Sequence, residues 1–101
     1  MPQAVPDGWT QTDNGLTRTL QRADFVEALA VVIEIGKLAE IANHHPDIKL
    51  HHYRQINLTL CSHDAGNSVT AKDFELAQRI NDLSEDAIRL TCDNLHQHFK
   101  A

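Results

Sequence analysis

The stretch Glu40-Ile41-Ala42-Asn43-His44-His45-Pro46 marks the point at which a long helical segment has to end. Upstream of it, apolar residues recur at steps of three and four between Phe25 and Asn43, and Asp24 stands where an N-cap is expected. A proline disfavours helical backbone in the residue before it, so Pro46 ends the helix. The sequence therefore predicts an amphipathic helix over 25–43, followed by two adjacent histidines.

Strand signals lie on both sides of this helix. Asp13-Asn14-Gly15 is typical of a tight turn, and the flanking segments 9–12 and 16–20 predict a β-hairpin around it. From Ile48 to Ser62, apolar residues alternate with polar ones, as in a half-buried strand. This segment is compatible with one long strand or with a hairpin that reverses near Tyr53-Arg54-Gln55.

A second helix is expected to begin at Thr70-Ala71-Lys72-Asp73, a variant of the capping box with aspartate as its acidic member. From Leu76 onward, apolar residues follow at steps of four and three as far as Leu90, which permits one long helix. Ser84-Glu85-Asp86 suits a new N-cap equally well, and would divide the segment into two helices.

The order strand, strand, helix, strand, strand, helix predicts an α+β fold. We expect a two-layer sandwich, with a four-stranded antiparallel sheet and two helices on one face (β-β-α-β-β-α), plus a C-terminal helical extension. The 101 residues suit a single domain over 1–101, with a core of about 8–83 and the extension at 84–101.

The composition limits the possible functions. The chain is 42% hydrophobic and 23% charged, which indicates a packed globule. Nine Lys and Arg against fourteen Asp and Glu give a charge of −5 without any basic run, which disfavours direct nucleic-acid binding. No signal peptide and no apolar run of about 20 residues is visible, so a soluble, cytoplasmic protein is expected. Cys61 and Cys92 are interpreted as buried thiols rather than a disulfide.

Three histidines and two carboxylates are the candidates for chemistry. His44, His45 and His63, with Glu40 and Asp73, suit proton transfer because imidazole titrates near neutral pH. The alternative for His44 and His45 is a helix C-terminus that attracts histidines through its dipole. No metal site is predicted for His44-His45 with His51-His52, because neighbouring residues on a strand point to opposite faces.

The spacing of these residues resembles that of a known family. Glu40-x3-His44-His45-Pro46, Tyr53, His63 and Asp73 occur in the order seen in pterin-4a-carbinolamine dehydratases, which are also known as dimerisation cofactors of a homeodomain transcription factor, with one residue more between His63 and Asp73 than is usual there. Gly8-Trp9, Asp24-Phe25-x-x-Ala28 and His63-Asp64-Ala65-Gly66 extend the resemblance over roughly 8–83.

The resemblance implies a hydro-lyase that converts 4a-hydroxytetrahydropterin to quinonoid dihydropterin, in tetrahydrobiopterin recycling, without a cofactor or metal. It implies His44 and His63 as acid/base groups on opposite sides of the pterin and His45 as a residue that positions it. Glu40, Asp73 and Trp9 are then candidates for substrate binding. Capping is the compatible second role of Asp73, core packing is the alternative for Trp9, and Tyr53 is expected to pack in the core. The hairpin within 48–62 is also implied.

The resemblance further implies a homodimer or homotetramer and, as a possible partner, an aromatic amino acid hydroxylase. Two apolar stripes of the second helical region cannot both face one core, so we expect one of them to contact another subunit. The stripes are Leu76, Ile80, Leu83, Ala87 and Leu90, and Ile88, Cys92, Leu95 and Phe99. The alternatives are a tail that folds back on its own subunit, a non-catalytic dimerisation or regulatory module, and a pterin-binding accessory of another pathway.

Overall fold

Two β-hairpins build the sheet of this protein, seen here in a computed structural model that describes residues 4–62, 66 and 68–100. The first joins β1 (Thr10–Thr12) to β2 (Gly15–Gln21), with Asp13 and Asn14 in the turn, as predicted. Gly15 has a φ of +132°, and a Cβ there would lie 2.2 Å from the Leu60 carbonyl oxygen. Only glycine fits this close approach of two strands.

The second hairpin joins β3 (Asp47–His51) to β4 (Gln55–Leu60), which decides between the two readings of this segment. His52 and Tyr53 turn the chain with φ values of 49° and 53°. Residues other than glycine rarely adopt positive φ, so alternation of polar and apolar residues could not reveal this turn.

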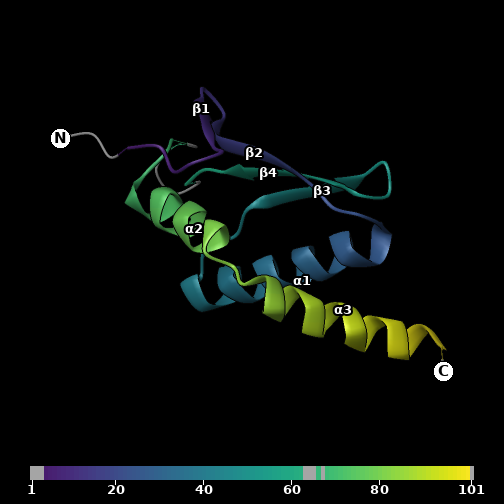
Figure 1. The fold of residues 1–101 in the computed structure, drawn as a ribbon. Helices are drawn as coiled ribbons and strands as arrows, with labels where there is room; N and C mark the ends of the chain where they lie inside the picture. The colour runs from purple at the N-terminus through teal and green to yellow at the C-terminus, as the bar shows by residue number, and fades with distance from the viewer. Residues whose placement is uncertain (1–3, 63–65, 67, 101) are drawn as a thin grey trace.

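The four strands form one antiparallel sheet in the order β1-β2-β4-β3. In the register of β2 against β4, Leu16 lies opposite Leu60 and Leu20 opposite Ile56. Ile56 and Leu60 are fully buried, while the Thr59 that alternates with them is half-buried. One face of the sheet is therefore apolar and covered by helices, as Figure 1 shows, which confirms the predicted α+β architecture.

Helix α1 (Phe25–Ala42) crosses the apolar face of the sheet. Its N-cap is Asp24, whose carboxylate accepts a hydrogen bond from the backbone N–H of Glu27 at 2.9 Å. Asn43 ends it in the left-handed conformation, with φ 49° and ψ 42°. Asparagine tolerates this conformation better than most residues, so the chain turns at Asn43 and delivers His44 and His45 beyond the helix end.

The second helical region consists of two helices, α2 (Ala71–Asn81) and α3 (Glu85–Lys100). The Oγ of Ser84 accepts a hydrogen bond from the backbone N–H of Ala87 at 2.9 Å, so Ser84 caps α3. The reading with a new N-cap at Ser84 is thus correct.

Helix α3 packs along α1 of its own chain (Figure 1). Ile88 is buried, and Cys92 and Leu95 pack against the same core. The Oγ1 of Thr91 donates a hydrogen bond to the buried carboxylate of Glu34 on α1 at 2.9 Å. Ile88, Cys92 and Leu95 of the second stripe are therefore covered within one chain, while Phe99 at its end is 56% exposed.

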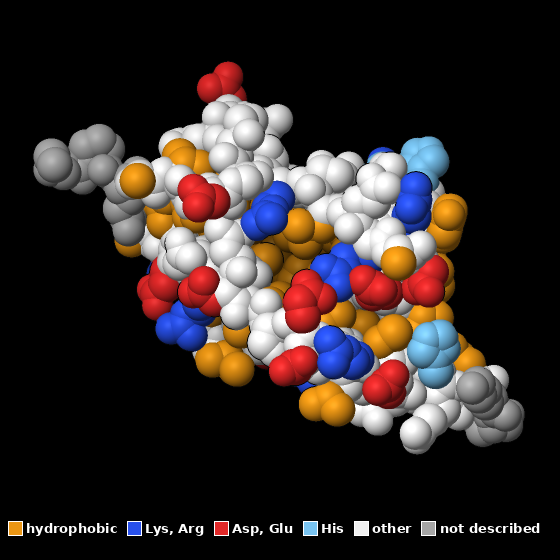
Figure 2. All heavy atoms as spheres, viewed as in Figure 1, with side chains coloured by type: hydrophobic (Ala, Val, Ile, Leu, Met, Phe, Trp, Pro, Cys, Tyr) orange, Lys and Arg blue, Asp and Glu red, His pale blue; other side chains and the backbone are white. Residues whose placement is uncertain are grey.

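Arg22 ties the beginning of α3 to the rest of the fold. Its guanidinium binds both carboxylate oxygens of Glu85, at 2.7 and 3.1 Å, and lies 2.7 Å from Glu27 on α1. Figure 2 shows, on this face, a hollow with hydrophobic side chains at its floor and charged ones around it. A cavity of about 120 Å³ lies where these elements meet, lined among others by Leu20 and Ile88.

Candidate active site

His44 and Asp73 form the central contact of the candidate site. His44 follows the C-cap of α1, and Asp73 lies in the first turn of α2. The Nε2 of His44 is 2.5 Å from the Oδ1 of Asp73, a distance typical of a strong, charge-assisted hydrogen bond. The side chain of His44 is 13% exposed and that of Asp73 is fully buried, so only the histidine reaches the surface.

The second carboxylate oxygen of Asp73 is fixed from two further segments. Its Oδ2 accepts hydrogen bonds from the Oγ of Ser62, just after β4, and from the backbone N–H of Thr70, each at 2.9 Å. The hydroxyls of Ser62 and Thr70 also lie 2.6 Å apart. Asp73 is thus both the acidic member of the predicted capping box and the group that orients His44.

This network constrains the proton that His44 carries. A carboxylate accepts hydrogen bonds only, so the Nε2 of His44 carries a hydrogen and donates it to Asp73. Proton exchange with any bound molecule then falls to Nδ1. An imidazole oriented in this way at the mouth of a cavity is suited to general acid and base chemistry.

His45 and Glu40 form a second, more exposed pair. The Nε2 of His45 is hydrogen-bonded to the Oε2 of Glu40 in the last turn of α1. Their side chains are 57% and 78% exposed, so both remain accessible from solvent. His63 lies outside the described residues. In the sequence it directly follows Ser62, which contacts Asp73.

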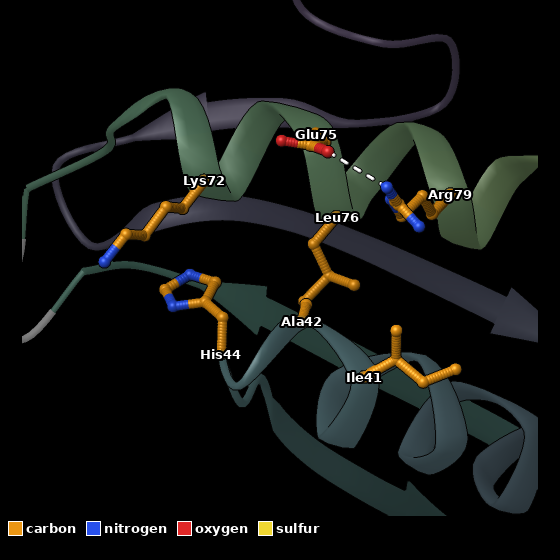
Figure 3. Close-up of a pocket in the computed structure, with 7 residues that line it drawn as sticks. All are labelled: Ile41, Ala42, His44, Lys72, Glu75, Leu76 and Arg79. Atoms are coloured by element: carbon orange, nitrogen blue, oxygen red, sulfur yellow. Dashed lines mark hydrogen bonds and ion pairs between the residues drawn. The ribbon is translucent and has the colours of Figure 1, made fainter.

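A cavity of about 150 Å³ opens beside His44, between the end of α1 and the outer face of α2. Figure 3 shows Lys72, Glu75, Leu76 and Arg79 from α2 facing Ile41, Ala42 and His44.

Trp9, the third candidate for substrate binding, does not line this cavity. It is 6% exposed within the hydrophobic core, and its indole N–H donates to the Oδ1 of Asn81 at 2.9 Å. An indole ring that is buried to this extent has no exposed face on which a pterin could stack. The reading of Trp9 as a core residue is the one that the structure supports.

Tyr53 was expected to pack in the core, but it lies at the surface. It is 61% exposed at the tip of the second hairpin, with the guanidinium of Arg54 5.9 Å from its ring centre, and so is not a core residue. Its place in a turn, rather than on a strand, is the cause.

The hairpin tip also changes the argument about His51 and His52. Their Nδ1 atoms lie 2.6 Å apart, so the two rings meet instead of pointing to opposite faces, because His52 belongs to the turn. Within the described part of the chain, no group of three or more His, Cys, Asp or Glu side chains is arranged to hold a metal ion.

Cys61 lies next to Ser62 but does not add a nucleophile to the site. Burial raises the pKa of its thiol, and the negative charges of Asp47 and Asp73 raise it further. The thiolate is the reactive form of cysteine, so a thiol that stays protonated is inert. Cys61 and Cys92 are both free, and neither forms a disulfide.

Ser62 and Thr70 are the site residues that the sequence argument missed. Thr70 carried a signal, since it opens the capping box that contains Asp73. Ser62 carried none, because its contact with Asp73 joins residues 11 positions apart through the return of the chain after β4.

Comparisons with known proteins point to one family. A family model described as pterin 4 alpha carbinolamine dehydratase matches residues 1–83, which leaves α3 outside the match. A protein of Roseiflexus castenholzii, described as a candidate pterin-4-alpha-carbinolamine dehydratase, is 43% identical over 76 residues, covering 75% of this chain and 80% of that protein. A protein of Nocardia farcinica with the same description is 39% identical over 82 residues, covering 81% and 83%.

The fold has a solved counterpart. The crystal structure of a transcriptional coactivator/pterin dehydratase from Brucella melitensis superposes with a TM-score of 0.67 at 31% identity, covering 74% of this chain and 80% of that one. Among the described residues, no helix is both long and apolar enough to cross a membrane.

Proposed function

Because this chain belongs to the pterin 4 alpha carbinolamine dehydratase family, we propose that it removes water from a 4a-hydroxytetrahydropterin to give the quinonoid dihydropterin. The reaction breaks the bond between carbon 4a and its hydroxyl oxygen and forms a double bond between carbon 4a and N5. N5 loses a proton, the leaving oxygen gains one, and water is released. Two proton transfers are the whole chemical requirement, and histidines suit both.

The observation that carries the proposal is the geometry around His44. Its ring is oriented by a fully buried carboxylate, which is itself fixed by Ser62 and Thr70, and it lines a cavity. In the proposed reaction the Nδ1 of His44 exchanges a proton with the pterin. The negative charge of Asp73 faces the ring while the ring carries the extra proton.

The remaining residues take supporting roles in the proposal. His63 is the acid/base group for the opposite side of the pterin, as the family pattern implies. His45 and Glu40, which are exposed and paired, position the substrate. A carboxylate such as that of Glu40 can accept hydrogen bonds from the amide and amino groups of the pterin edge. Asp73 acts through His44, since it is fully buried and holds that ring.

We place the reaction in the recycling of tetrahydrobiopterin, where an aromatic amino acid hydroxylase produces the carbinolamine. The hydroxylase is then the supplier of the substrate. A homodimer or homotetramer is part of the same proposal, and the cytoplasm is the proposed location.

The test is turnover. 4a-Hydroxytetrahydropterin is generated by a hydroxylase, and quinonoid dihydropterin is followed by absorbance with and without the protein. Replacing His44 or His63 by alanine should slow turnover on one pterin face by roughly two to four orders of magnitude, the usual contribution of a general acid or base. His98→Ala is the matched control, because His98 is exposed on α3, outside the family match.

Two outcomes would count against the proposal. If wild-type protein did not accelerate dehydration, the family fold would serve here as a non-catalytic dimerisation or regulatory module. The structural neighbour from Brucella, a transcriptional coactivator/pterin dehydratase, makes that the leading alternative. If the double variant at His44 and His63 kept wild-type turnover on both stereoisomers, the histidine mechanism would be wrong.

A further inference from the structure

The cavity beside His44 has a part that proton transfer does not use. His44 occupies one end, while Leu76 and Arg79 on α2 lie opposite Ile41 on α1 (Figure 3). Ile41 is 75% exposed, although it is a large apolar residue at the edge of a functional cavity. With Leu76, which lines the cavity from α2, Ile41 gives this part of the cavity an apolar wall, as ligand pockets commonly have.

Two cationic side chains stand along the cavity. Lys72 and Arg79 line it together with the carboxylate of Glu75. Arg79 is hydrogen-bonded to Glu75 at 3.1 Å, and the two side chains are 51% and 67% exposed. An exposed pair four residues apart on a helix is weak, and a guanidinium has five N–H donors, so Arg79 can still bind an anion.

The spacing of the two cationic side chains along the cavity follows from the geometry of α2. Lys72 and Arg79 are seven residues apart on α2, which corresponds to about 10 Å along the axis at a rise of about 1.5 Å per residue. Residues at this spacing lie on the same side of a helix, and Leu76 lies between them. The lining therefore runs from the acid/base histidine over an apolar middle to a guanidinium.

The chemistry of the pterin says what would occupy this space. Carbon 6 is bonded to N5, the nitrogen that loses its proton in the proposed reaction, so a substituent on carbon 6 begins beside the acid/base group. We propose that the cavity receives this substituent, and that Arg79 selects pterins whose substituent ends in an anion, either a carboxylate or a phosphate. The proposal rests on the proposed function only in placing the pterin ring beside His44.

Binding of stable, fluorescent pterins tests this without turnover. Neopterin is compared with neopterin 3′-monophosphate, and pteroic acid with its carboxamide, so that each pair differs only in the charged group. We expect the anionic member of at least one pair to bind about fivefold more tightly, as an exposed ion pair allows. The pair that shows the preference identifies phosphate or carboxylate. Salt at 0.5 M should reduce the preference, because exposed charges are screened.

Variants assign the preference to Arg79. Arg79→Gln should abolish it, and Glu75→Gln should increase it, because removal of the carboxylate leaves the guanidinium free to bind the ligand. Arg89→Gln is the matched control, since Arg89 is an exposed arginine that pairs with Asp86 on α3 and lies outside this cavity. Circular dichroism establishes whether each variant is folded. If Arg79→Gln does not fold, Glu75→Gln still tests whether Arg79 causes the preference.

Three results would overturn the inference: equal affinity within both pairs, a preference that survives Arg79→Gln or falls in Glu75→Gln, or no binding of any of the four pterins at millimolar concentration. The proposed function fails on a different measurement, namely the absence of dehydration by wild-type protein. A protein that prefers anionic pterins but does not dehydrate them would refute the dehydratase and leave the binding inference standing.

Discussion

Asp73 reaches the cavity only through His44, so its substitution separates orientation of the histidine from catalysis itself. Asp73→Asn keeps the size of the side chain and an oxygen for the backbone N–H of Thr70, but it removes the charge opposite Nε2 of His44. We expect kcat to fall about 10- to 100-fold, the usual effect of losing a group that orients a functional histidine. KM should change little, and the pH profile of kcat should shift.

A purely structural role of Asp73 would give a different pattern. Loss of the capping box alone would lower the melting temperature and leave the pH profile of the folded fraction unchanged. Steady-state kinetics between pH 6 and 9, with the folded fraction measured alongside, tell the two apart. Ser62→Ala is the companion variant, since it removes one hydrogen bond to Asp73 and keeps its charge.

The structural roles of residues that depend on local chain geometry were predictable from the sequence. Roles that depend on tertiary contacts were not. The caps at Asp24 and Thr70 follow from local pattern, and both occur. Tyr53 was expected in the core but is exposed, and for Trp9 the pattern left core packing and substrate binding open, because burial of an aromatic ring depends on which segments return to it. The contact between Asp73 and Ser62 is of the same kind.

At the scale of elements, the contact of α3 with α1 depends on Glu34. The carboxylate is buried, with the ammonium of Lys37 at 2.8 Å and the hydroxyl of Thr91 at 2.9 Å. The hydrogen bond from Lys37 lowers the pKa of Glu34 most, the one from Thr91 lowers it further, and burial opposes both.

This lowered pKa makes the stability of the fold depend on pH. A carboxyl whose pKa is lower in the folded state stabilises the fold above its unfolded pKa, about 4.3, and loses this contribution as the pH falls through the folded pKa. Glu34→Gln should therefore be less stable than wild type by about 1.5–3 kcal/mol at pH 7, as for a hydrogen bond to a charged group.

Urea unfolding at several pH values between 7 and 3 measures this difference. We expect it to shrink below about pH 4.3. A difference that stayed constant down to pH 3 would show that the charge of Glu34 is not involved. Thr91→Val isolates the contribution of α3, because it leaves the pair of Glu34 and Lys37 in place.

The boundary between α2 and α3 shows how far periodicity can be used to predict elements. Apolar residues continue at helical steps through 82–84, so the hydrophobic pattern alone does not mark the break. The pattern identified α1 to within one residue, because Pro46 and Asn43 terminate it locally. No comparable residue stands after Asn81, and the cap at Ser84 had to compete with a continuous helix.

At the scale of the whole molecule, we predict that activity is independent of metal. Elimination from the carbinolamine requires proton transfer only, and the paired histidines each have a partner within the chain. Dialysis against a strong chelator should leave turnover unchanged. Loss of activity that one divalent metal restores would contradict this prediction and would require a new account of His51 and His52.

The packing of α3 on α1 of the same chain changes what we expect of the contact between subunits. We still expect a homo-oligomer from the family, but Ile88, Cys92 and Leu95 are covered by their own chain. Truncation after Leu83 should therefore leave the number of subunits in the oligomer unchanged, as light scattering measures it. It should also lower stability by at least about 3 kcal/mol, because it exposes the apolar surface that α3 covers on α1.

A point variant guards against a truncated chain that does not fold. Ile88 is only 5% exposed, so Ile88→Ala should lower the free energy of unfolding by about 2–4 kcal/mol. Leu90 is 66% exposed, so Leu90→Ala should lower it by less than about 0.5 kcal/mol. If Ile88→Ala dissociated the oligomer without loss of subunit stability, α3 would be an interface helix after all. A monomeric full-length protein would rule out the oligomer itself, and α3 would then complete the fold of a single subunit.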